Sequence, residues 1–401
     1  MMKWFQSSRS GAPLLSGLVL MSVALSACGA ASTTGIDAAG TNGVSASVKS
    51  AAPAPAEKPE DLYELAKKEG KVVVYSTSGR ANDAKKSFEA KYPGVTVEVF
   101  KVKSNDMMDK LIREQDAGLY NADLIITKEV SGAVEEEMVK PGRIYKYLPE
   151  DIAKHVEEPF RTQSPGYANY VEMRSLYYNT EAYTQPPVTN WWDLTTPEWK
   201  GKVYTADPLS SPAFMDLFTA MTVNSEDMKK AYKDKFGKDI ELNGTENAGY
   251  EFIKRLVGNG LIVLKGSGDV LEAIGKAGSK SPAVGIAVSG DMSTVEEEGL
   301  KVAPMFDVQP KASVPDAGYL YMVNKAPHVN AGKLLMRWMM GEADGKAEGL
   351  VPFNQLGAWV PRTDVKTVNA FPFEKLNMWT YDAQAFYKNS GKVRDFWIKL
   401  K

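Results

Sequence analysis

Apolar runs and amphipathic segments alternate along the chain from about residue 58 onward. The stretch "KVVVYSTSGR" at residues 71–80 begins with a continuous apolar run, which is typical of a strand covered on both faces. A helical pattern follows at residues 81–94 and ends in a Pro-Gly pair. The chain then shows a strand, a helix and another strand, at residues 95–100, 105–118 and 122–127. This order predicts an α/β fold with parallel-type sheets and helices on both faces.

The same strand-then-helix pattern recurs in three later segments, at residues 201–223, 261–278 and 283–299. Ligands gather at the carboxyl ends of parallel strands, and the helix amino ends found there favour anions. Serine, threonine, glycine and aspartate also cap helices without touching any ligand, so each position has this second interpretation. The candidate ligand-binding residues at these junctions are Ser76, Thr77, Ser78, Arg80, Thr127, Lys128, Asp207, Ser210, Ser211, Ser267, Gly268, Ser289, Gly290 and Asp291.

Residues 1–27 have the pattern of a secretory signal peptide, with Lys3 and Arg9 ahead of an apolar run of sixteen residues. A membrane-spanning helix needs roughly 20 apolar residues, so this run is too short to span. The junction "LSAC" ends at Cys28, the only cysteine of the chain, and resembles a bacterial lipobox. The resemblance implies cleavage before Cys28 and lipidation of its sulfur. We therefore expect a lipid-anchored protein on the extracytoplasmic face of a membrane, without disulfides.

Residues 28–57 are rich in Ala, Ser, Thr, Gly and Pro, and this composition predicts a flexible tether. The remaining composition is that of a globular protein. The net charge of the whole chain is -2, and loss of the signal peptide with its two basic residues makes it -4. This balance disfavours nucleic acid as a partner, because phosphate backbones require a basic surface.

Three further stretches carry a family resemblance. The segment "LYYNTEAYTQPPVTNWWDLTTPEWKGKVYTADP" at residues 176–208 resembles the signature of extracellular solute-binding proteins of ABC importers, in the group of ferric-ion, phosphonate, thiamine and sugar-phosphate binders. Residues 104–126 and 317–341 resemble other parts of the same proteins. The resemblance implies a two-lobed type II periplasmic-binding-protein fold, whose lobes close like a hinge on a ligand in the cleft between them.

The implied lobes are joined by strands that cross near residues 168–178 and 308–322. These strands add Arg174, Tyr177 and Tyr319 to the candidate ligand-binding residues. The expected divisions are 58–168 for the first part of lobe 1, 169–310 for lobe 2, 311–350 for the return into lobe 1, and 351–401 for C-terminal helices that pack across the lobes.

The sequence shows no motif of an enzyme. It has two histidines, His155 and His328, and lacks a HExxH motif, a nucleophile elbow and a phosphate loop. We therefore predict a monomeric binding protein without cofactor or resident metal, which delivers its solute to a permease and an ATPase on separate chains. An extracytoplasmic enzyme on the same scaffold and a structural surface lipoprotein are the alternatives from other functional classes.

The nature of the solute depends on charge. Ferric binders of the resembling group use adjacent tyrosines near the stretch that here reads "VSGD" at residues 288–291, and this pair is absent. We therefore predict a small anionic solute of the phosphonate, sugar-phosphate or carboxylate type, with Arg80 or Arg174 as its charge partner. Ferric iron bound by Tyr319, Tyr321 and Asp291 is the first alternative. A neutral sugar stacked on Trp191 or Trp359 is the second.

The lipobox predicts the outcome of a single substitution. Cys28→Ala should move the protein from the membrane fraction to the soluble fraction, because the sulfur that carries the lipid is lost. Fractionation with a labelled fatty acid measures this. Unchanged membrane association, with no label on the wild type, would exclude the anchor.

Overall fold

The computed structural model describes residues 57–401. The predicted signal peptide, Cys28 and most of the predicted tether lie outside these described residues. Among residues 57–401, no helix combines the length and apolar character that crossing a membrane requires.

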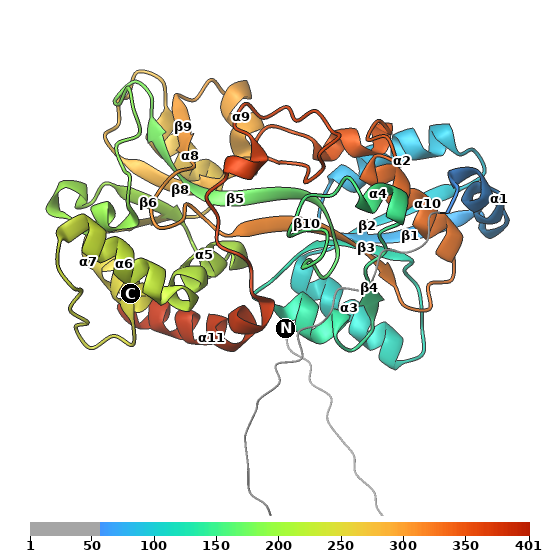
Figure 1. The fold of residues 1–401 in the computed structure, drawn as a ribbon, viewed down its shortest axis with the longest axis horizontal. Helices are drawn as coiled ribbons and strands as arrows, with labels where there is room; N and C mark the ends of the chain where they lie inside the picture. The colour runs from blue at the N-terminus through green and yellow to red at the C-terminus, as the bar shows by residue number, and fades with distance from the viewer. Residues whose placement is uncertain (1–56) are drawn as a thin grey trace, which may run out of the picture. The chain divides into compact units, whose positions relative to one another are not determined.

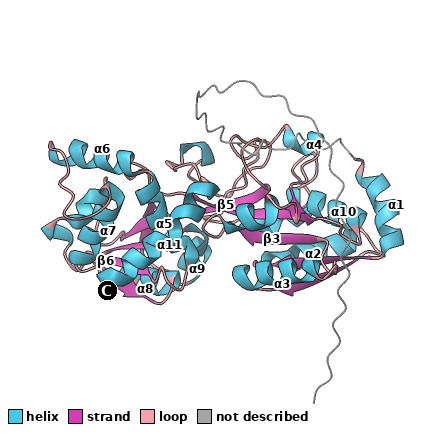
Figure 2. Ribbon diagram, turned by 90° about the horizontal axis from the view of Figure 1, so that it is seen from below, coloured by secondary structure: helices cyan, strands magenta, loops and turns pink. Residues whose placement is uncertain are grey.

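The first lobe is built on three parallel strands, in which Val74 lies beside Val99 and Leu124. Helices flank these strands (Figure 2). The strands of this lobe are β1 (Lys71–Ser76), β2 (Thr96–Lys101), β3 (Leu124–Lys128) and the short β4 (Ile144–Tyr145). Its helices are α1 (Pro59–Glu69), α2 (Arg80–Lys91), α3 (Ser104–Asp116), α4 (Glu150–Ala153) and α10 (Val329–Met340), with the short helical segments η1 (Glu135–Val139) and η5 (Glu348–Phe353).

Two long strands, β5 (Tyr167–Asn179) and β10 (Pro315–Val323), connect the lobes (Figure 1). The first half of β5 pairs antiparallel with β10, and its second half pairs antiparallel with β8 and β9 of the second lobe. One strand thus belongs to both sheets. Eight strands follow one another in the order β2-β1-β3-β10-β5-β8-β6-β7, and β4 and β9 pair beside this path with β10 and β5. All 13 residues of β5 are buried, so this strand crosses the molecule between two cores.

The second lobe repeats the parallel pattern, since β6 runs parallel to both β7 and β8. Its core contains Trp192, whose ring meets that of Phe252 edge-on with the centroids 5.2 Å apart. The strands are β6 (Val203–Ala206), β7 (Ile262–Leu264), β8 (Val284–Val288) and β9 (Val302–Met305). The helices are α5 (Pro212–Val223), α6 (Ser225–Phe236), α7 (Ala248–Gly258), α8 (Ser267–Gly275) and α9 (Met292–Glu297), with η2 (Trp191–Thr195), η3 (Pro197–Trp199) and η4 (Ser289–Asp291).

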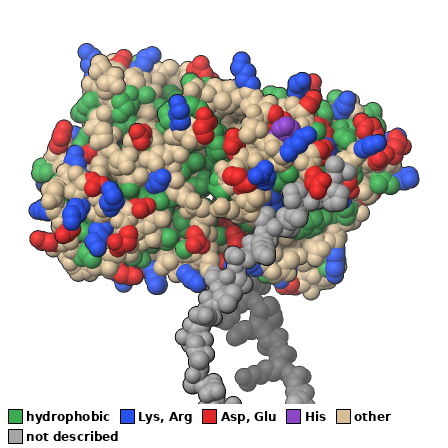
Figure 3. Space-filling model, in the orientation of Figure 1, with side chains coloured by type: hydrophobic (Ala, Val, Ile, Leu, Met, Phe, Trp, Pro, Cys, Tyr) green, Lys and Arg blue, Asp and Glu red, His purple; other side chains and the backbone are tan. Residues whose placement is uncertain are grey.

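The C-terminal segment passes η6 (Phe373–Lys375) and ends in α11 (Ala383–Leu400). Helix α11 packs against α5 and α7 of the second lobe and also contacts η1 of the first lobe. The rings of Trp397 and Phe218 lie 5.1 Å apart between α11 and α5. Tyr387 donates a hydrogen bond of 2.9 Å to Glu137 in η1. Charged side chains of both signs are interspersed on the face seen in Figure 3, so no single-sign patch marks a binding surface there.

The start of α11 presses on the loop after β3. A Cβ atom on Gly132 would lie 1.9 Å from the carbonyl oxygen of Ala383, and Gly132 has a φ of +81°. Gly142 has a similar φ of +74° but nothing within 4 Å of its Cβ position. The same substitution at these two glycines therefore distinguishes the effect of backbone strain from the effect of close contact.

Gly142→Ala should lower the free energy of unfolding by roughly 1–2 kcal/mol, because a side chain is strained at positive φ. Gly132→Ala should lower it by a further 1–3 kcal/mol or so, since α11 must move away from the loop. Urea unfolding of both variants measures the difference. Equal losses would show that α11 does not pack tightly against this loop.

Candidate functional site between the lobes

The strand register brings the carboxyl ends of both sheets to the middle of β5. Lys128, the last residue of β3, pairs with Gly318 of β10. Two residues earlier in β10, Asp316 pairs with Glu172 of β5. From the other lobe, Val288 at the end of β8 pairs with Arg174. Residues that end strands in different lobes therefore meet beside residues 172–174.

Five charged side chains form an ion network at this point. Glu172 accepts hydrogen bonds from Arg80 Nη2 at 2.9 Å and from Lys128 Nζ at 2.5 Å. Asp316 pairs with both Lys128 and Arg174. The two carboxylates are each 8% exposed, so the network lies away from bulk water.

The network keeps its charges at neutral pH. Burial alone would raise the pKa of the Glu172 carboxyl, but the attraction of Lys128 and Arg80 outweighs it and lowers this pKa. Burial also opposes the charge of Asp316, and Arg174 and Lys128 lower its pKa in the same way. For Lys128, the two carboxylates overcome burial and raise the pKa of the ammonium group. Lys128, Glu172 and Asp316 are therefore all ionised.

Two guanidinium donors in the network remain unused. Arg80 Nη1 and Arg174 Nε are buried and have no hydrogen-bond partner among the described residues. Aromatic rings hold both groups in place, with Arg80 4.3 Å from the ring centre of Tyr170 and Arg174 5.6 Å from that of Phe214. Buried donors are normally paired, so these two mark a place where an acceptor group fits.

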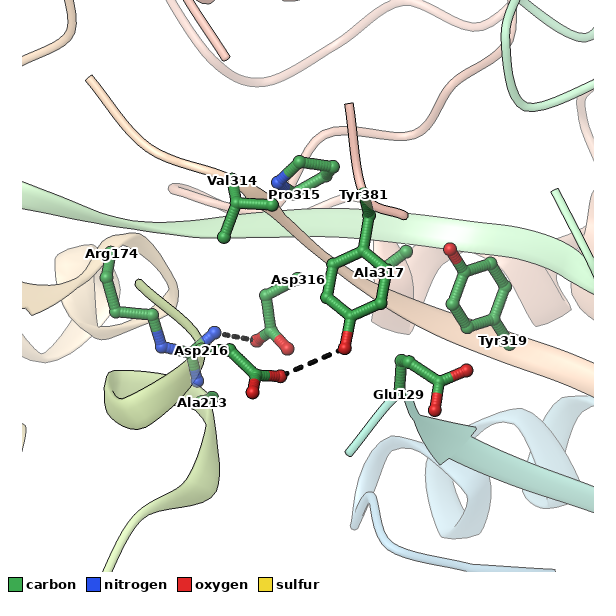
Figure 4. Close-up of a pocket in the computed structure, with 10 residues that line it drawn as sticks. All are labelled: Glu129, Arg174, Ala213, Asp216, Val314, Pro315, Asp316, Ala317, Tyr319 and Tyr381. Carbon is green, nitrogen blue, oxygen red and sulfur yellow. Dashed lines mark hydrogen bonds and ion pairs between the residues drawn. The ribbon is translucent and has the colours of Figure 1, made fainter. Parts of the chain in front are cut away.

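A small pocket adjoins the network and shares Arg174 and Asp316 with it (Figure 4). Asp216 of α5 bridges the lobes there, accepting hydrogen bonds from the backbone N and the Oγ of Ser131, at 3.1 and 2.9 Å. Tyr381 donates a third hydrogen bond to Asp216, and its hydroxyl accepts one from Gly132 N. The pocket is lined by Glu129, Arg174, Ala213, Asp216, Val314, Pro315, Asp316, Ala317, Tyr319 and Tyr381.

Two of the three acids that line the pocket, Asp216 and Glu129, are poorly solvated. Burial raises the pKa of Asp216 to about 6, although hydrogen bonds from Ser131 and Tyr381 work against this rise. Burial raises the pKa of Glu129 to about 8, despite hydrogen bonds from the backbone N of Val134 and Val130. At neutral pH Glu129 is therefore mostly protonated, whereas Asp216 is mostly ionised.

The hydroxyl groups predicted after β1 and β3 form hydrogen bonds with backbone groups, in their own turn or on the neighbouring strand. Ser76 Oγ donates to the carbonyl of Ser78, and Thr77 Oγ1 donates to that of Ile126. Ser78 Oγ accepts from Arg80 N at 3.3 Å. Thr127 is buried and donates to the carbonyl of Lys128. Of these predicted residues of the first lobe, Arg80 and Lys128 alone join the ion network.

In the second lobe, Gly290 and Asp291 lie closest to the network. A Cβ on Gly290 would lie 2.4 Å from Glu172 Oε1. Burial raises the pKa of Asp291, against the hydrogen bond from Ser267, and the charges of Glu172, Arg174 and Lys128 also act on this carboxyl. Ser289 is buried and donates from Oγ to the carbonyl of Gly357 at 2.5 Å.

The other predicted residues of the second lobe have local roles. Ser267 Oγ accepts from Val288 N, Ser210 Oγ donates to the carbonyl of Asp207, and Ser211 is the N-cap residue of α5. Asp207 faces Lys401 at 3.6 Å, and Gly268 is exposed in the first turn of α8.

The aromatic candidates divide between pocket and core. Tyr319 lines the pocket, whereas Tyr177 and Tyr321 are fully buried and their hydroxyls have no partner among the described residues. Trp191 and Trp359 are also buried, and each indole donates to a backbone carbonyl. These two tryptophans therefore have no exposed face on which a sugar ring stacks.

The sequence interpretation missed Glu172, Asp316, Asp216 and Tyr381. A signal for the first exists in "YANYVEMRSLYYN", where Glu172 and Arg174 are two residues apart in an otherwise uncharged strand. Such residues share one face, and buried charges must be paired. Asp216 likewise stands in the apolar helix "PAFMDLFTAMTV". Tyr381 has no such local signal.

Several solved structures of two-lobed binding proteins are similar to this one. Iron-bound HitA from Pseudomonas aeruginosa has 16% identity and a TM-score of 0.60, over 82% of this chain and 99% of that one. Apo ferric-ion-binding protein A from Pasteurella haemolytica has 17% identity and a TM-score of 0.62, over 82% and 98%. AfuA from Actinobacillus pleuropneumoniae, bound to fructose-6-phosphate, has 19% identity and a TM-score of 0.58, over 82% and 98%. The fold is therefore that of a type II periplasmic binding protein.

A family profile identifies the chain more closely. The profile of bacterial extracellular solute-binding proteins matches residues 83–375, and the chain belongs to this family. No curated protein matches the sequence. The family and the two-lobed α/β fold that the sequence predicts are thus confirmed, and the family and the structural neighbours consist of binding proteins.

The raised pKa of Asp216 in the pocket predicts how the stability of the protein depends on pH. Because the folded pKa of Asp216, about 6, exceeds the ordinary 3.8, the folded state holds a proton that the unfolded state has lost between these values. Its stabilising effect is complete below pH 4 and is lost as the pH rises through 6. The difference in unfolding free energy between wild type and Asp216→Asn should fall by up to about 1.4 kcal/mol per pH unit in this window.

Chemical unfolding at several pH values between 4 and 7 measures this slope. Asp109→Asn, which removes a carboxylate that is 66% exposed, should leave the shape of the curve unchanged. Parallel curves for wild type and Asp216→Asn would contradict the raised pKa.

Proposed function

We propose that the protein is the lipid-anchored solute-binding subunit of an ABC importer and that it captures a small anionic solute between its lobes. Membership of the solute-binding family supports the general role. The observation that supports the anion is the meeting of Arg80, Lys128 and Arg174 at one interlobe point, with two buried guanidinium donors unused. Lipidation at Cys28 holds the protein at the membrane, and a separate permease and ATPase receive the solute.

The three cations reach this point from three different elements. Arg80 is the first residue of α2, Lys128 ends β3, and Arg174 lies in the crossing strand β5. A phosphonate, phosphate ester or carboxylate has acceptor oxygens that two guanidinium groups can bind together. Arg80 and Lys128 reach the solute from the first lobe, and Arg174 from the half of β5 that pairs with β8 of the second lobe. Contacts from both sides then favour the closed arrangement of the lobes, because a ligand shifts a hinge only by binding one state better.

Ferric iron is the second candidate, since several of the structural neighbours are named as ferric-binding proteins. Tyr319 is close to Glu129 and Asp216 in the pocket, which supplies oxygen ligands. However, burial and the charge of Glu129 raise the pKa of the Tyr319 hydroxyl, and the adjoining network carries three cations. Both features oppose a phenolate-bound trivalent cation, so we favour the anion.

The proposal predicts a specific loss of affinity. Arg80→Met should weaken binding of the anionic solute by about tenfold to a hundredfold, because a charge-assisted hydrogen bond contributes about 1.5–3 kcal/mol. Arg113→Met, which removes an arginine that is 80% exposed, is the matched control and should bind like the wild type. Native mass spectrometry of protein from its own host identifies the solute, and calorimetry against phosphate esters, phosphonates and carboxylates measures the affinities.

Three outcomes oppose this proposal. Equal affinities in Arg80→Met and wild type would remove Arg80 from the site. A coloured protein that ignores every anion and loses its colour in Tyr319→Phe would establish iron instead. Sustained conversion of the bound solute would show an enzyme.

A further inference from the structure

Glu172 occupies the space between the lobes. Its carboxylate joins Arg80 and Lys128 of the first lobe, at 2.9 and 2.5 Å, and faces Gly290 of the second lobe. The contact with Gly290 is so close that a Cβ there would lie 2.4 Å from Glu172 Oε1. The carboxylate is therefore enclosed by both lobes.

The donors that hold Glu172 are two of the three cations to which we assign the solute. A carboxylate side chain and an anionic solute present the same kind of oxygen to Arg80 and Lys128. In the structure, the protein satisfies these cations with its own carboxylate. Glu172 thus has the position and the chemistry of a bound anion.

The carboxylates of the network limit the electrostatic attraction that it exerts on an incoming anion. Three cations face the carboxylates of Glu172 and Asp316, which leaves one positive charge. Asp291 and the ionised Asp216 stand nearby and reduce the attraction further. The positive charges are therefore almost fully neutralised by the protein's own carboxylates. An added anion binds tightly only if it displaces one of these carboxylates from the cations.

We propose that Glu172 is an internal competitor of the solute: it occupies Arg80 and Lys128 in the empty protein, gives them up when an anion binds, and so sets the affinity and selectivity of the site. This inference rests on the proposed function. Asp316 pairs with Lys128 and Arg174, whereas Glu172 pairs with Arg80 and Lys128 and also lies against Gly290 of the second lobe, so the exchange centres on Glu172. Weak anions do not displace Glu172, and solutes with more charge or more acceptor oxygens do.

Glu172→Gln tests the exchange, since it removes the charge and keeps the shape. Inorganic phosphate is the probe. The unfolding temperature of the full chain in phosphate is compared with that in sodium chloride of equal ionic strength. In chloride the variant should unfold at a lower temperature than the wild type, because Arg80 and Lys128 lose a partner. Phosphate should raise the unfolding temperature of the variant back toward that of the wild type. Calorimetry should show that Glu172→Gln binds phosphate at least tenfold more tightly than the wild type does.

Glu251→Gln is the matched control. Glu251 is a buried carboxylate, 1% exposed and paired with Arg255 in α7, remote from the ion network. Its substitution should lower the unfolding temperature without any additional response to phosphate. If Glu172→Gln does not fold, Glu172→Asp, which withdraws the carboxylate by one methylene, should also bind phosphate more tightly than the wild type.

The outcomes separate the two proposals. Phosphate or organic-anion affinity that is unchanged or weaker in both Glu172 variants, while the wild type binds anions, would show that Glu172 only orients the cations. That result overturns the internal competitor and leaves the proposed function intact. Absence of anion binding in wild type and variants alike would overturn both.

Discussion

The structure depends on the burial of charge in the two strands that connect the lobes. Strand β5 is buried along its whole length, yet it carries Glu172 and Arg174 on one face. An unpaired charge at such a depth is unfavourable by several kcal/mol, so each must have a partner from another element. The partners Arg80, Lys128 and Asp316 come from α2, β3 and β10. The hinge strands, the strand ends and the first turn of α2 are therefore held in one arrangement.

This requirement also explains why a binding site forms here. Ion pairs between buried groups contribute little net stability, because desolvation offsets most of their attraction. Exchange of one carboxylate for another anion consequently changes the energy only modestly, whereas removal of either partner changes it strongly. A site built from paired charges can therefore be firmly ordered when empty and still accept a solute.

A second set of contacts connects the lobes through the C-terminal segment. Asp216 of α5 accepts a hydrogen bond from Ser131 in the loop after β3. The hydroxyl of Tyr381 donates to Asp216 and accepts from Gly132 N of the same loop. Gly132 allows the start of α11 to lie against that loop. A hinge motion between the lobes must either break these contacts or move the residues that form them together. The segment before α11 therefore takes part in the opening of the site, together with β5 and β10.

The sequence by itself determined the α/β pattern, the family and the approximate place of the crossing strands, because strand and helix periodicity and local motifs depend on neighbouring residues. It also marked Arg80, Lys128 and Arg174, which follow or lie within recognisable strands. Only the tertiary structure decided that most of the predicted serines bond to the protein's own backbone, as Ser76 does, and that Thr77 bonds to Ile126 of β3. It likewise decided that Glu172 and Asp316 occupy the cations, and that Tyr381 reaches Asp216 over 165 residues of chain. Charge pairing across strands depends on register and on contacts between distant segments, which local sequence patterns do not contain.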